Sequence, residues 1–440
     1  MERIIKIGKT LRNNWKKSVL GAVVLYYGAA TAKERYEINI LMRAACKEAA
    51  KYGDALIPMD RNPTLITIIL NPVANKRKAK KDFEKYCEPL LHLAGLQVDV
   101  IQTTSEGHAK EIVETLRGTE AIIVAGGDGT LSETVTGLLR RNDDANRFPL
   151  GVLPLGRTNS VGNTLFPRGD GVAKVKQLIE ACMAIVENNT TWKNVMKIEP
   201  LNEETPSKPI YALNSMEWGA FRETQAKKDK YWIYGPFREY ASYIFNGYKN
   251  TLSWDCRGTI KYTPPCSGCS NCVVKKPEVK RKWTFFIPTK EAASETDLTT
   301  RINPECATES EMCFKTTDFI IQPQVSDGVP SLNVGLAKNS YSYFEFVSEG
   351  WRRAKGDDNR SAVVQARTIE LQPQEPKPDV VIAIDQEEFE VKPVKITILP
   401  NKVKFFCRPE LKLYNESNSN IEIKLIFFGC TTRLFFVKTT

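Results

Sequence analysis

The stretch that decides the fold of this chain runs from Ala125 to Leu139 and reads Ala-Gly-Gly-Asp-Gly-Thr-Leu-Ser-Glu-Thr-Val-Thr-Gly-Leu-Leu. Its first two residues end the apolar, strand-like run 121–126, and the rest of the stretch opens a helical pattern. In an open α/β sheet, ligands bind beyond the carboxyl ends of the strands. Glycines there let backbone N–H groups approach a phosphate, and the next helix directs its positive end at the anion. The stretch therefore predicts a phosphate-binding βα turn.

Asp128 lies in the middle of this turn, between Gly127 and Gly129. An acid at that place could bind Mg²⁺ or accept a hydroxyl proton beside a transferring phosphoryl group. The alternative is an ordinary glycine-rich turn in which the Asp caps the helix. The paired glycines before the acid and the Gly-Thr after it favour a functional loop. The loop lacks the Gly-Lys-Ser/Thr of a Walker A motif and the spacing of a GxGxxG dinucleotide turn.

Strand-like and helical patterns alternate on both sides of the loop. Apolar, β-branched runs predict strands at 64–70, 96–102, 121–126 and 149–155, and helical spacing predicts helices at 76–94, 106–117, 130–141 and 172–187. Strands with little polar alternation, separated by helices, indicate a parallel sheet that is covered on both faces. We expect a Rossmann-like α/β nucleotide-binding domain over residues 60–190.

The second half has a different pattern. Short alternating runs between turn signals predict a mainly antiparallel β-sandwich domain over residues 191–409. An aromatic-rich, helical segment interrupts it at 230–248, and 264–311 is expected to be a loop-rich insertion. No structure is predicted for the tail 410–440.

Residues 1–58 are expected to be a targeting or anchoring segment with a helical linker. The first 20 residues are basic with apolar residues on one helical face, which is typical of a mitochondrial address. The uncharged stretch 18–32 follows, flanked by Lys17 and Lys33; it is shorter than the roughly 20 residues of a spanning helix. A marginal anchor, an interfacial helix and a secretory apolar region all remain open, and the pattern favours membrane association.

Composition excludes several classes of protein. The chain has 440 residues, of which 42% are apolar and 26% charged, so a disordered, collagen-like or polytopic membrane protein is excluded. Its net charge of +10 suits an acidic ligand or an anionic membrane. The basic clusters 76–81 and 275–282 are not interleaved with aromatic residues, so no nucleic-acid partner is predicted.

Three of the 11 cysteines have the spacing of metal ligands. Cys266, Cys269 and Cys272 form a CxxCxxC motif, which could hold a structural Zn²⁺. The fourth ligand could come from Cys256, Cys306 or Cys313. The alternatives are a cysteine-rich surface loop and a redox-labile one.

Several motifs occur in one order along the chain. Asn71-Pro72 ends the first strand, Thr104 precedes Gly107-His108-Ala109, the glycine loop follows, and residues 153–166 read LPLGRTNSVGNTLF. Later come Glu217-Trp218-Gly219 and an Asp385-Gln386-Glu387 triplet. In this order the motifs resemble those of lipid kinases of the diacylglycerol kinase and sphingosine kinase superfamily. The resemblance covers about residues 8–409.

The resemblance implies an activity, partners and a location. The implied reaction is ATP-dependent, Mg²⁺-dependent phosphorylation of a lipid hydroxyl. The runs 218–222 and 384–390 and the basic start resemble the mitochondrial branch that phosphorylates monoacylglycerol and diacylglycerol to lysophosphatidate and phosphatidate. That branch implies attachment to the anionic mitochondrial inner membrane, facing the intermembrane space. It also implies a second role beside the translocase that imports carrier proteins.

Site residues are carried over by motif. The resemblance gives Asp128 and Asp385 catalytic roles, with Asp128 also holding Mg²⁺ through ATP. His108 is expected near the nucleotide as an early helix residue. The implied nucleotide-binding residues are Asn71, Thr104, Gly126, Gly127, Gly129, Thr130, Gly156 and Arg238. The implied lipid-binding residues are Glu133, Asn159, Ser160 and Glu223.

The chain also departs from the superfamily pattern. Val73-Ala74-Asn75 replaces an early Gly or Ser, Ser160 stands where many relatives have Asp, and Gln386 replaces the glycine of the late Asp-Gly-Glu. Two alternatives therefore stay open. One is an NAD kinase, which shares the Gly-Gly-Asp-Gly loop, and the other is a non-enzymatic, membrane-bound scaffold of an import complex.

Overall fold

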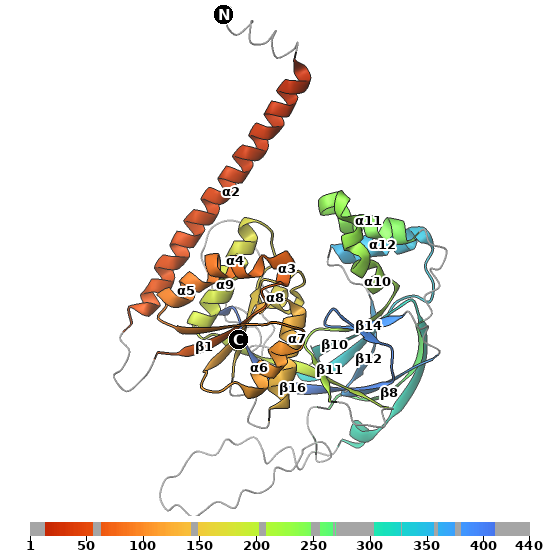
Figure 1. Cartoon of the computed structure of the whole chain (residues 1–440). Helices are drawn as coiled ribbons and strands as arrows, with labels where there is room; N and C mark the ends of the chain where they lie inside the picture. Colours follow the sequence, from red (N-terminus) through yellow and green to blue (C-terminus); the bar gives the residue numbers. More distant parts are fainter. Residues whose placement is uncertain are drawn as a thin grey trace, which may run out of the picture.

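Two β-sheets with helices around them make up this protein, as the computed structural model shows (Figure 1). The structure describes residues 14–55, 63–141, 148–201, 208–247, 256–266, 269, 303–326, 328–355, 360–374 and 380–409. The basic start, Cys272, most of the predicted insertion 264–311 and the tail 410–440 lie outside these residues.

Parallel strands build the first part of the larger sheet, in the order β2-β1-β3-β4. They are β1 (Leu65–Leu70), β2 (Gln97–Gln102), β3 (Ala121–Gly126) and β4 (Leu150–Pro154). Every residue of β3 and β4 is buried, as expected for strands with helices on both faces. The four strands match the predicted runs to within one residue at each end.

The predicted helices of this half are present, and one of them is broken. α6 (His108–Thr115), α7 (Asp128–Arg140) and α9 (Val172–Val186) fall where the pattern predicts them. The predicted helix 76–94 is divided into α3 (Ala74–Arg77), α4 (Ala79–Asp82), the π-helix η1 (Phe83–Cys87) and α5 (Glu88–Leu93). Positive φ at Asn75 and Lys76 breaks its start, and Pro89 in the first turn of α5 cannot donate a helical hydrogen bond. The short helix α8 (Ser160–Leu165) was not predicted.

The larger sheet continues into the second half of the chain as β4-β16-β13-β8-β9. β16 (Val394–Phe406) pairs in parallel with β4 and antiparallel with β5 (Thr190–Pro200), and β5 also pairs with β6 (Ile210–Ala212). The outer strands are β13 (Thr368–Pro373), β8 (Cys256–Thr263) and β9 (Ser310–Thr316). One sheet thus crosses residue 190, and a domain boundary at that residue stays a prediction.

The smaller sheet is wholly antiparallel, with the order β12-β11-β10-β7-β14-β15. Its strands are β7 (Met216–Gly219), β10 (Asp318–Ser326), β11 (Val329–Leu336), β12 (Ser361–Ala366), β14 (Val381–Ile384) and β15 (Glu387–Glu390). Phe319 and Val334 of this sheet share a buried core with Ile260 and Ile396 of the larger one. The predicted class is confirmed: a mainly parallel α/β sheet with a second, antiparallel sheet packed as a sandwich.

A helical layer covers one end of the sandwich. It contains α10 (Ala220–Ala226), the 3₁₀ segment η3 (Lys227–Phe237), α11 (Arg238–Gly247) and α12 (Tyr343–Ala354). The helical interruption predicted at 230–248 corresponds to η3 and α11. α12 was not predicted, although Ser342 and Glu345 form a capping box at its start. Phe221, Tyr243 and Phe346 hold the layer together.

The long helix α2 (Trp15–Gly53) contains the predicted stretch 18–32. Only its second half packs on the body, where Ala45 and Ala49 are buried, and its first half projects away from the body (Figure 1). Apolar side chains on the projecting half are open to solvent; Leu25, for example, is 74% exposed. Within the part of the chain that the structure describes, no helix combines the length and the apolar character that crossing a bilayer requires.

Candidate active site

The glycine loop joins β3 to α7 and lies directly against a second loop at residues 155–159. Gly126 ends β3, Gly127 caps α7, and the N–H of Asp128 donates to the Thr158 carbonyl at 3.1 Å. The N–H of Gly156 donates to the Gly126 carbonyl at 2.8 Å. Two turns at the carboxyl ends of neighbouring strands are thereby joined into one unit.

Gly156 is required by this close approach. A Cβ at residue 156 would collide with the Gly127 Cα and lie 2.6 Å from the Gly127 nitrogen. A Cβ at residue 127 would lie 3.0 Å from the Thr158 carbonyl oxygen. Asn159 closes its own loop, since its side-chain amide accepts from the Gly156 N–H and donates to the Gly156 carbonyl, both at 2.9 Å.

Asp128 is buried beneath the two loops, with 3% of its surface exposed. Its carboxylate accepts from the N–H of Ser160 at 2.9 Å and from that of Val161 at 3.5 Å. These donors are the first two residues of α8, whose positive end therefore faces the acid. Burial raises the pKa of Asp128, and the hydrogen bonds from Ser160 and Val161 oppose that rise.

Asp385 reaches the site from the other end of the chain. It occupies the two-residue turn between β14 and β15, where Asp385 and Gln386 have φ of 46° and 74°. Gln386 thus adopts a left-handed conformation, which glycine favours, at the place where the Asp-Gly-Glu motif expected from the resemblance has glycine. The Asp385 carboxylate accepts from the N–H groups of Leu213, Asn214 and Ser215 at 2.7, 2.8 and 3.0 Å.

Asp385 is buried, and the hydrogen bonds that its carboxylate accepts offset only part of the effect of burial on its pKa. Burial raises its pKa to about 6, the three N–H donors oppose this rise, and the negative charge of Asp128 adds to it. The charge of Asp128 thus contributes to the pKa of Asp385, although the two acids are 257 positions apart in the sequence. The catalytic roles that the resemblance gives to both acids stay predictions, and the structure places the two side chains near enough for this electrostatic effect.

Glu387 also lies at this site, although the sequence predicts no role for this last residue of the Asp385-Gln386-Glu387 triplet. It begins β15, and a Cβ on Gly129 would collide with its Oε1, so the carboxylate lies on the glycine loop. Burial and then the charges of Glu133 and Glu106 raise the pKa of Glu387 to about 7. Its position in that triplet was the signal that could have identified it.

Asn71, which follows β1, and Thr130, in the first turn of α7, lie on the side of the glycine loop that faces β1. The Asn71 side-chain amide donates to the Thr130 hydroxyl at 3.0 Å, and its oxygen accepts from the Val73 N–H at 3.2 Å. A Cβ on Gly126 would lie 2.9 Å from the same hydroxyl. The structure therefore groups Asn71, Gly126 and Thr130, which were predicted as nucleotide contacts.

Glu133 and His108 organise the loop that follows β2. The Glu133 carboxylate accepts from the N–H of Gly107 at 2.9 Å and from that of Ala109 at 3.2 Å, and so caps α6. The His108 Nδ1 lies 3.1 Å from both the backbone nitrogen and the hydroxyl of Thr104. Both residues therefore hold the 104–109 loop beside the glycine loop.

Glu223 and Arg238 lie in the helical layer. Glu223 of α10 forms an ion pair with Lys227, the first residue of η3. Arg238 lies 3.4 Å from Asp229, and the same carboxylate pairs with Arg157 at 2.8 Å. Since Arg157 follows Gly156, this ion-pair chain connects the helical layer to the second loop.

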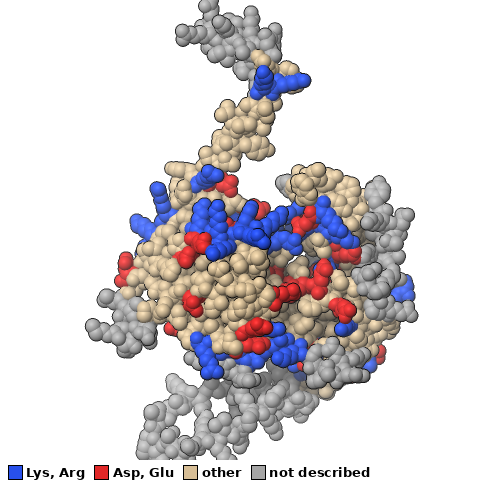
Figure 2. All heavy atoms as spheres, in the orientation of Figure 1, with Lys and Arg blue, Asp and Glu red and all other residues tan. Residues whose placement is uncertain are grey.

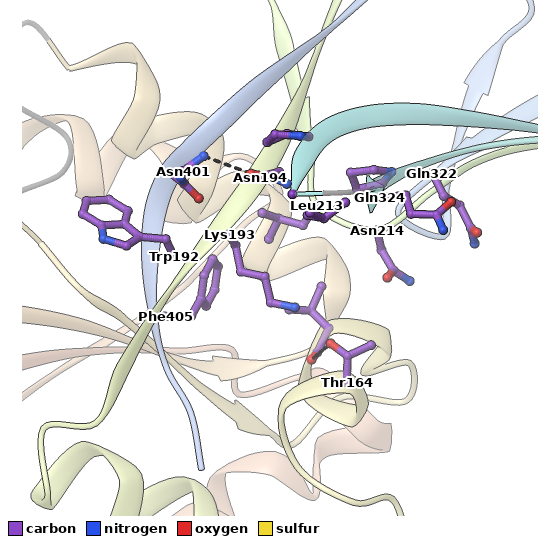
Figure 3. Close-up of a pocket in the computed structure, with 15 residues that line it drawn as sticks. Thr164, Trp192, Lys193, Asn194, Leu213, Asn214, Gln322, Gln324, Asn401 and Phe405 are labelled. Carbon is purple, nitrogen blue, oxygen red and sulfur yellow. Dashed lines mark hydrogen bonds between the residues drawn. The ribbon is translucent and has the colours of Figure 1, made fainter. Parts of the chain in front are cut away.

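A cavity of about 600 Å³ opens beside the site (Figure 3). It lies between α8, β5, β16 and the β10–β11 turn, and it is lined partly by Leu213 and Asn214, whose N–H groups hold Asp385. Lys193 points toward Thr164 across the cavity, and burial lowers the pKa of this lysine. The hydrogen bond from the Asn401 N–H to Asn194 closes one end at 3.0 Å.

Two of the three motif cysteines can be placed. The sulfurs of Cys266, Cys269 and Cys306 all lie within 4.8 Å of one another, so this cluster could bind a metal ion. Cys306 was one of three residues proposed as a further ligand. Cys272 lies outside the described residues.

Comparison with known proteins gives matches over most of the chain. Residues 65–198 match the diacylglycerol kinase catalytic domain family, and residues 213–418 match the acylglycerol kinase C-terminal family. The human protein named "Acylglycerol kinase, mitochondrial" is 34% identical over 415 residues, covering 91% of this chain and 96% of its own. Its Xenopus laevis counterpart is 32% identical over 430 residues, covering 94% and 97%.

A solved structure described as a diacylglycerol kinase from Bacillus anthracis str. Sterne superposes with a TM-score of 0.48 at 16% identity, covering 79% of this chain and 98% of its own. The family assignment rests on the sequence matches, which include both halves of the chain and nearly the full length of the relatives. The chain belongs to the acylglycerol kinase family, with a catalytic domain of the diacylglycerol kinase type.

Proposed function

We propose that this protein transfers the γ-phosphate of ATP to a hydroxyl of monoacylglycerol or diacylglycerol, giving lysophosphatidate or phosphatidate. The observation that carries the proposal is the meeting of Asp128, Asp385 and Glu387 at the glycine loop. The names of the relatives supply the acceptor class.

The two joined loops suit the phosphates of ATP. The positive end of α7 is directed at the place where an anion would bind, and the close packing of Gly156 on Gly127 holds the second loop beside it. Arg238 is coupled to the second loop through Asp229 and Arg157. The remaining nucleotide contacts in the proposal are Asn71, Thr104, Gly126, Gly127, Gly129 and Thr130.

The acidic groups fit a magnesium ion. Carboxylate oxygens are the ligands that Mg²⁺ prefers. Burial, and to a smaller extent neighbouring negative charges, raise the pKa values of Asp385 and Glu387, and a cation beside them would favour their ionised forms. When bound, Mg²⁺ would neutralise charge on the phosphate oxygens. Asp128 and Glu387 are the side chains proposed to hold it with ATP.

Asp128 and Asp385 are proposed to act on the acceptor. Asp128 orients the lipid hydroxyl toward the γ-phosphate, since phosphoryl transfer depends mainly on positioning and charge. With a pKa of about 6, Asp385 is mostly ionised at pH 7 and can take the hydroxyl proton. The proposed lipid contacts are Ser160 and Glu223, with Glu133 and Asn159 positioning the loops beside them.

The test is transfer of labelled phosphate from ATP–Mg²⁺ to monoacylglycerol and diacylglycerol in detergent. Asp128→Asn keeps the size of the side chain and removes its charge, and we expect a loss of at least about 100-fold in turnover. Asp99→Asn is the matched control, because Asp99 is exposed on β2. Equal activity of folded Asp128→Asn and wild type would contradict the proposal, and transfer to NAD instead of lipid would favour the NAD kinase alternative.

The surface that meets the membrane is proposed to include the helical layer and the projecting half of α2. Trp232, Ile233 and Phe237 of η3 and Phe344 of α12 are 68–81% exposed. The helical layer, seen at α11 and α12, lies at the same end of the molecule as the projecting half of α2 (Figure 1). Figure 2 shows Lys and Arg side chains in a band below this end. Apolar side chains above a basic band suit an anionic bilayer.

Vesicle flotation tests this surface. The double variant Phe237→Ser/Phe344→Ser should lose most binding to anionic vesicles, while Val363→Ser, at an exposed apolar residue of β12, should not. Unchanged flotation of the double variant would remove the helical layer from the proposal. The mitochondrial inner membrane, on the intermembrane-space side, is the proposed location, and the relatives named above are mitochondrial.

A second role in carrier-protein import remains a prediction from the resemblance alone. Asp128→Asn separates the two roles in cells that lack the wild-type chain. If import is restored by this variant while lipid phosphorylation is not, the scaffold role is independent of the kinase site.

A further inference from the structure

The cysteine cluster lies far along the larger sheet from the kinase site, at the end of the β8–β9 pair where the long connection between these two strands begins. Cys266 follows β8, and Cys306 lies in the short 3₁₀ helix Pro304–Ala307 just before β9. Cys269 joins them as a buried residue, and Cys306 is also buried. Tyr262 and Ser310 are the last paired residues of these two strands, so the cluster sits where the pairing ends.

We propose that Cys266, Cys269 and Cys306 bind a structural Zn²⁺ ion. Thiolate sulfur favours Zn²⁺ over Mg²⁺ or Ca²⁺, and Cys-x-x-Cys is a common pair of ligands in structural zinc sites. Tetrahedral ligands about 2.3 Å from zinc lie about 3.8 Å apart. The three sulfurs, all within 4.8 Å of one another, would close by no more than about 1 Å around the ion.

Hydrogen-bond donors support two of the sulfurs. The Asn303 side-chain amide donates to the Cys266 sulfur at 3.4 Å, and the Arg367 guanidinium donates to the Cys306 sulfur at 3.6 Å. Donors of this kind stabilise the negative charge of a coordinated thiolate and orient it toward the metal. A cysteine-rich surface loop would need neither the burial nor these donors.

Arg367 also connects the cluster to the rest of the sandwich. It lies between β12 and β13, at the point where the chain crosses from the smaller to the larger sheet. The backbone N–H of Arg367 donates a hydrogen bond of 2.8 Å to the carbonyl of Thr263, the last residue of β8. A zinc ion here would hold together the two ends of the long connection between β8 and β9 and secure β9, which is the edge strand of the sheet.

Metal analysis of the full-length protein, purified in detergent with reductant, tests the site without reference to kinase activity. We expect about one zinc per chain, with three or four sulfur neighbours by X-ray absorption. Cys266→Ser and Cys306→Ser should each reduce the zinc content at least about tenfold. Cys313→Ser is the matched control, because Cys313 is an exposed residue of neighbouring β9, and it should keep the ion.

Cobalt titration of the reduced wild type keeps the test decisive where a variant fails to fold. Cobalt should give the thiolate charge-transfer absorption and release protons, since each thiol must deprotonate to bind. Absence of zinc together with no uptake of zinc or cobalt would overturn the proposal. So would a disulfide between any two of the three cysteines in the purified protein, or zinc that persists in both the Cys266 and Cys306 variants.

Discussion

The contact between the two loops makes Gly156→Ala the sharpest test of the active-site geometry. The added methyl group would collide with the Gly127 Cα and lie 2.6 Å from its nitrogen. Unbonded carbon atoms pack best at about 3.5–4.0 Å, so the loops must separate by about 1 Å. Overpacking of this kind costs about 1–3 kcal/mol of folding free energy.

The effect on catalysis should exceed the effect on stability. A misplacement of about 1 Å in a site that works by positioning can reduce turnover about 100-fold. The assay is phosphate transfer to monoacylglycerol at a temperature well below the unfolding midpoint, which is measured separately for each variant. Gly127→Ala should be milder, because its methyl group would meet the Thr158 oxygen at 3.0 Å and the Gly156 Cα at 3.3 Å.

Gly28→Ala provides the control, since a Cβ on this residue of α2 meets nothing within 4 Å. It should leave activity unchanged and strengthen the helix by up to about 1 kcal/mol. The reasoning fails if Gly156→Ala melts like the wild type and keeps its turnover. A loss in Gly127→Ala larger than that in Gly156→Ala would equally refute the proposed packing of the loops.

Two further predictions concern the acids. The raised pKa of Asp385 means that the folded protein holds this proton longer than the unfolded chain, so stability should fall by about 3 kcal/mol between pH 4 and pH 6 and then level off. The free energy of unfolding, measured with urea at each pH, should change less with pH in Asp385→Asn than in the wild type. Parallel plots of this free energy against pH for the two proteins would show that Asp385 is not the cause. Glu387→Gln should raise the Mg²⁺ concentration for half-maximal activity about tenfold. Glu390→Gln, at the exposed far end of the same strand β15, should not change it, and identical Mg²⁺ curves for both variants would remove Glu387 from the metal site.

The strands of the first half could be predicted because each is a local apolar run with a strong turn signal after it. β3 is the clearest example, because all six of its residues are buried and the glycine loop follows it directly in the sequence. The pairing of β16 with β4 and β5 could not be predicted. Its partners lie about 200 or more residues away, and alternation along one strand says which face is buried, not which strand is beside it.

The active site could be predicted only in part from the sequence, because some of its contacts join residues that are far apart along the chain. Asp128 and Gly156 were found by motif, whereas the contact of Glu387 with Gly129 depends on the fold of the last strands. The capping role of Glu133 likewise appears only when α6 and α7 are placed side by side. Cys306 shows the same limit, because it lies far from Cys266 in sequence and near it in space.

The place of β16 in the larger sheet has a consequence for how this protein is made. Phe405, Phe406 and Cys407 are buried in the core of the first half, and β16 covers the edge of β4. During synthesis, β1 to β4 emerge from the ribosome long before this strand does, and they leave an unpaired edge and an unfilled core. A chain that stops short of residue 394 would lack the strand that completes its own nucleotide-binding sheet. Chaperones, or any translocation machinery that carries the chain unfolded, would have to protect that edge until the last strand arrives.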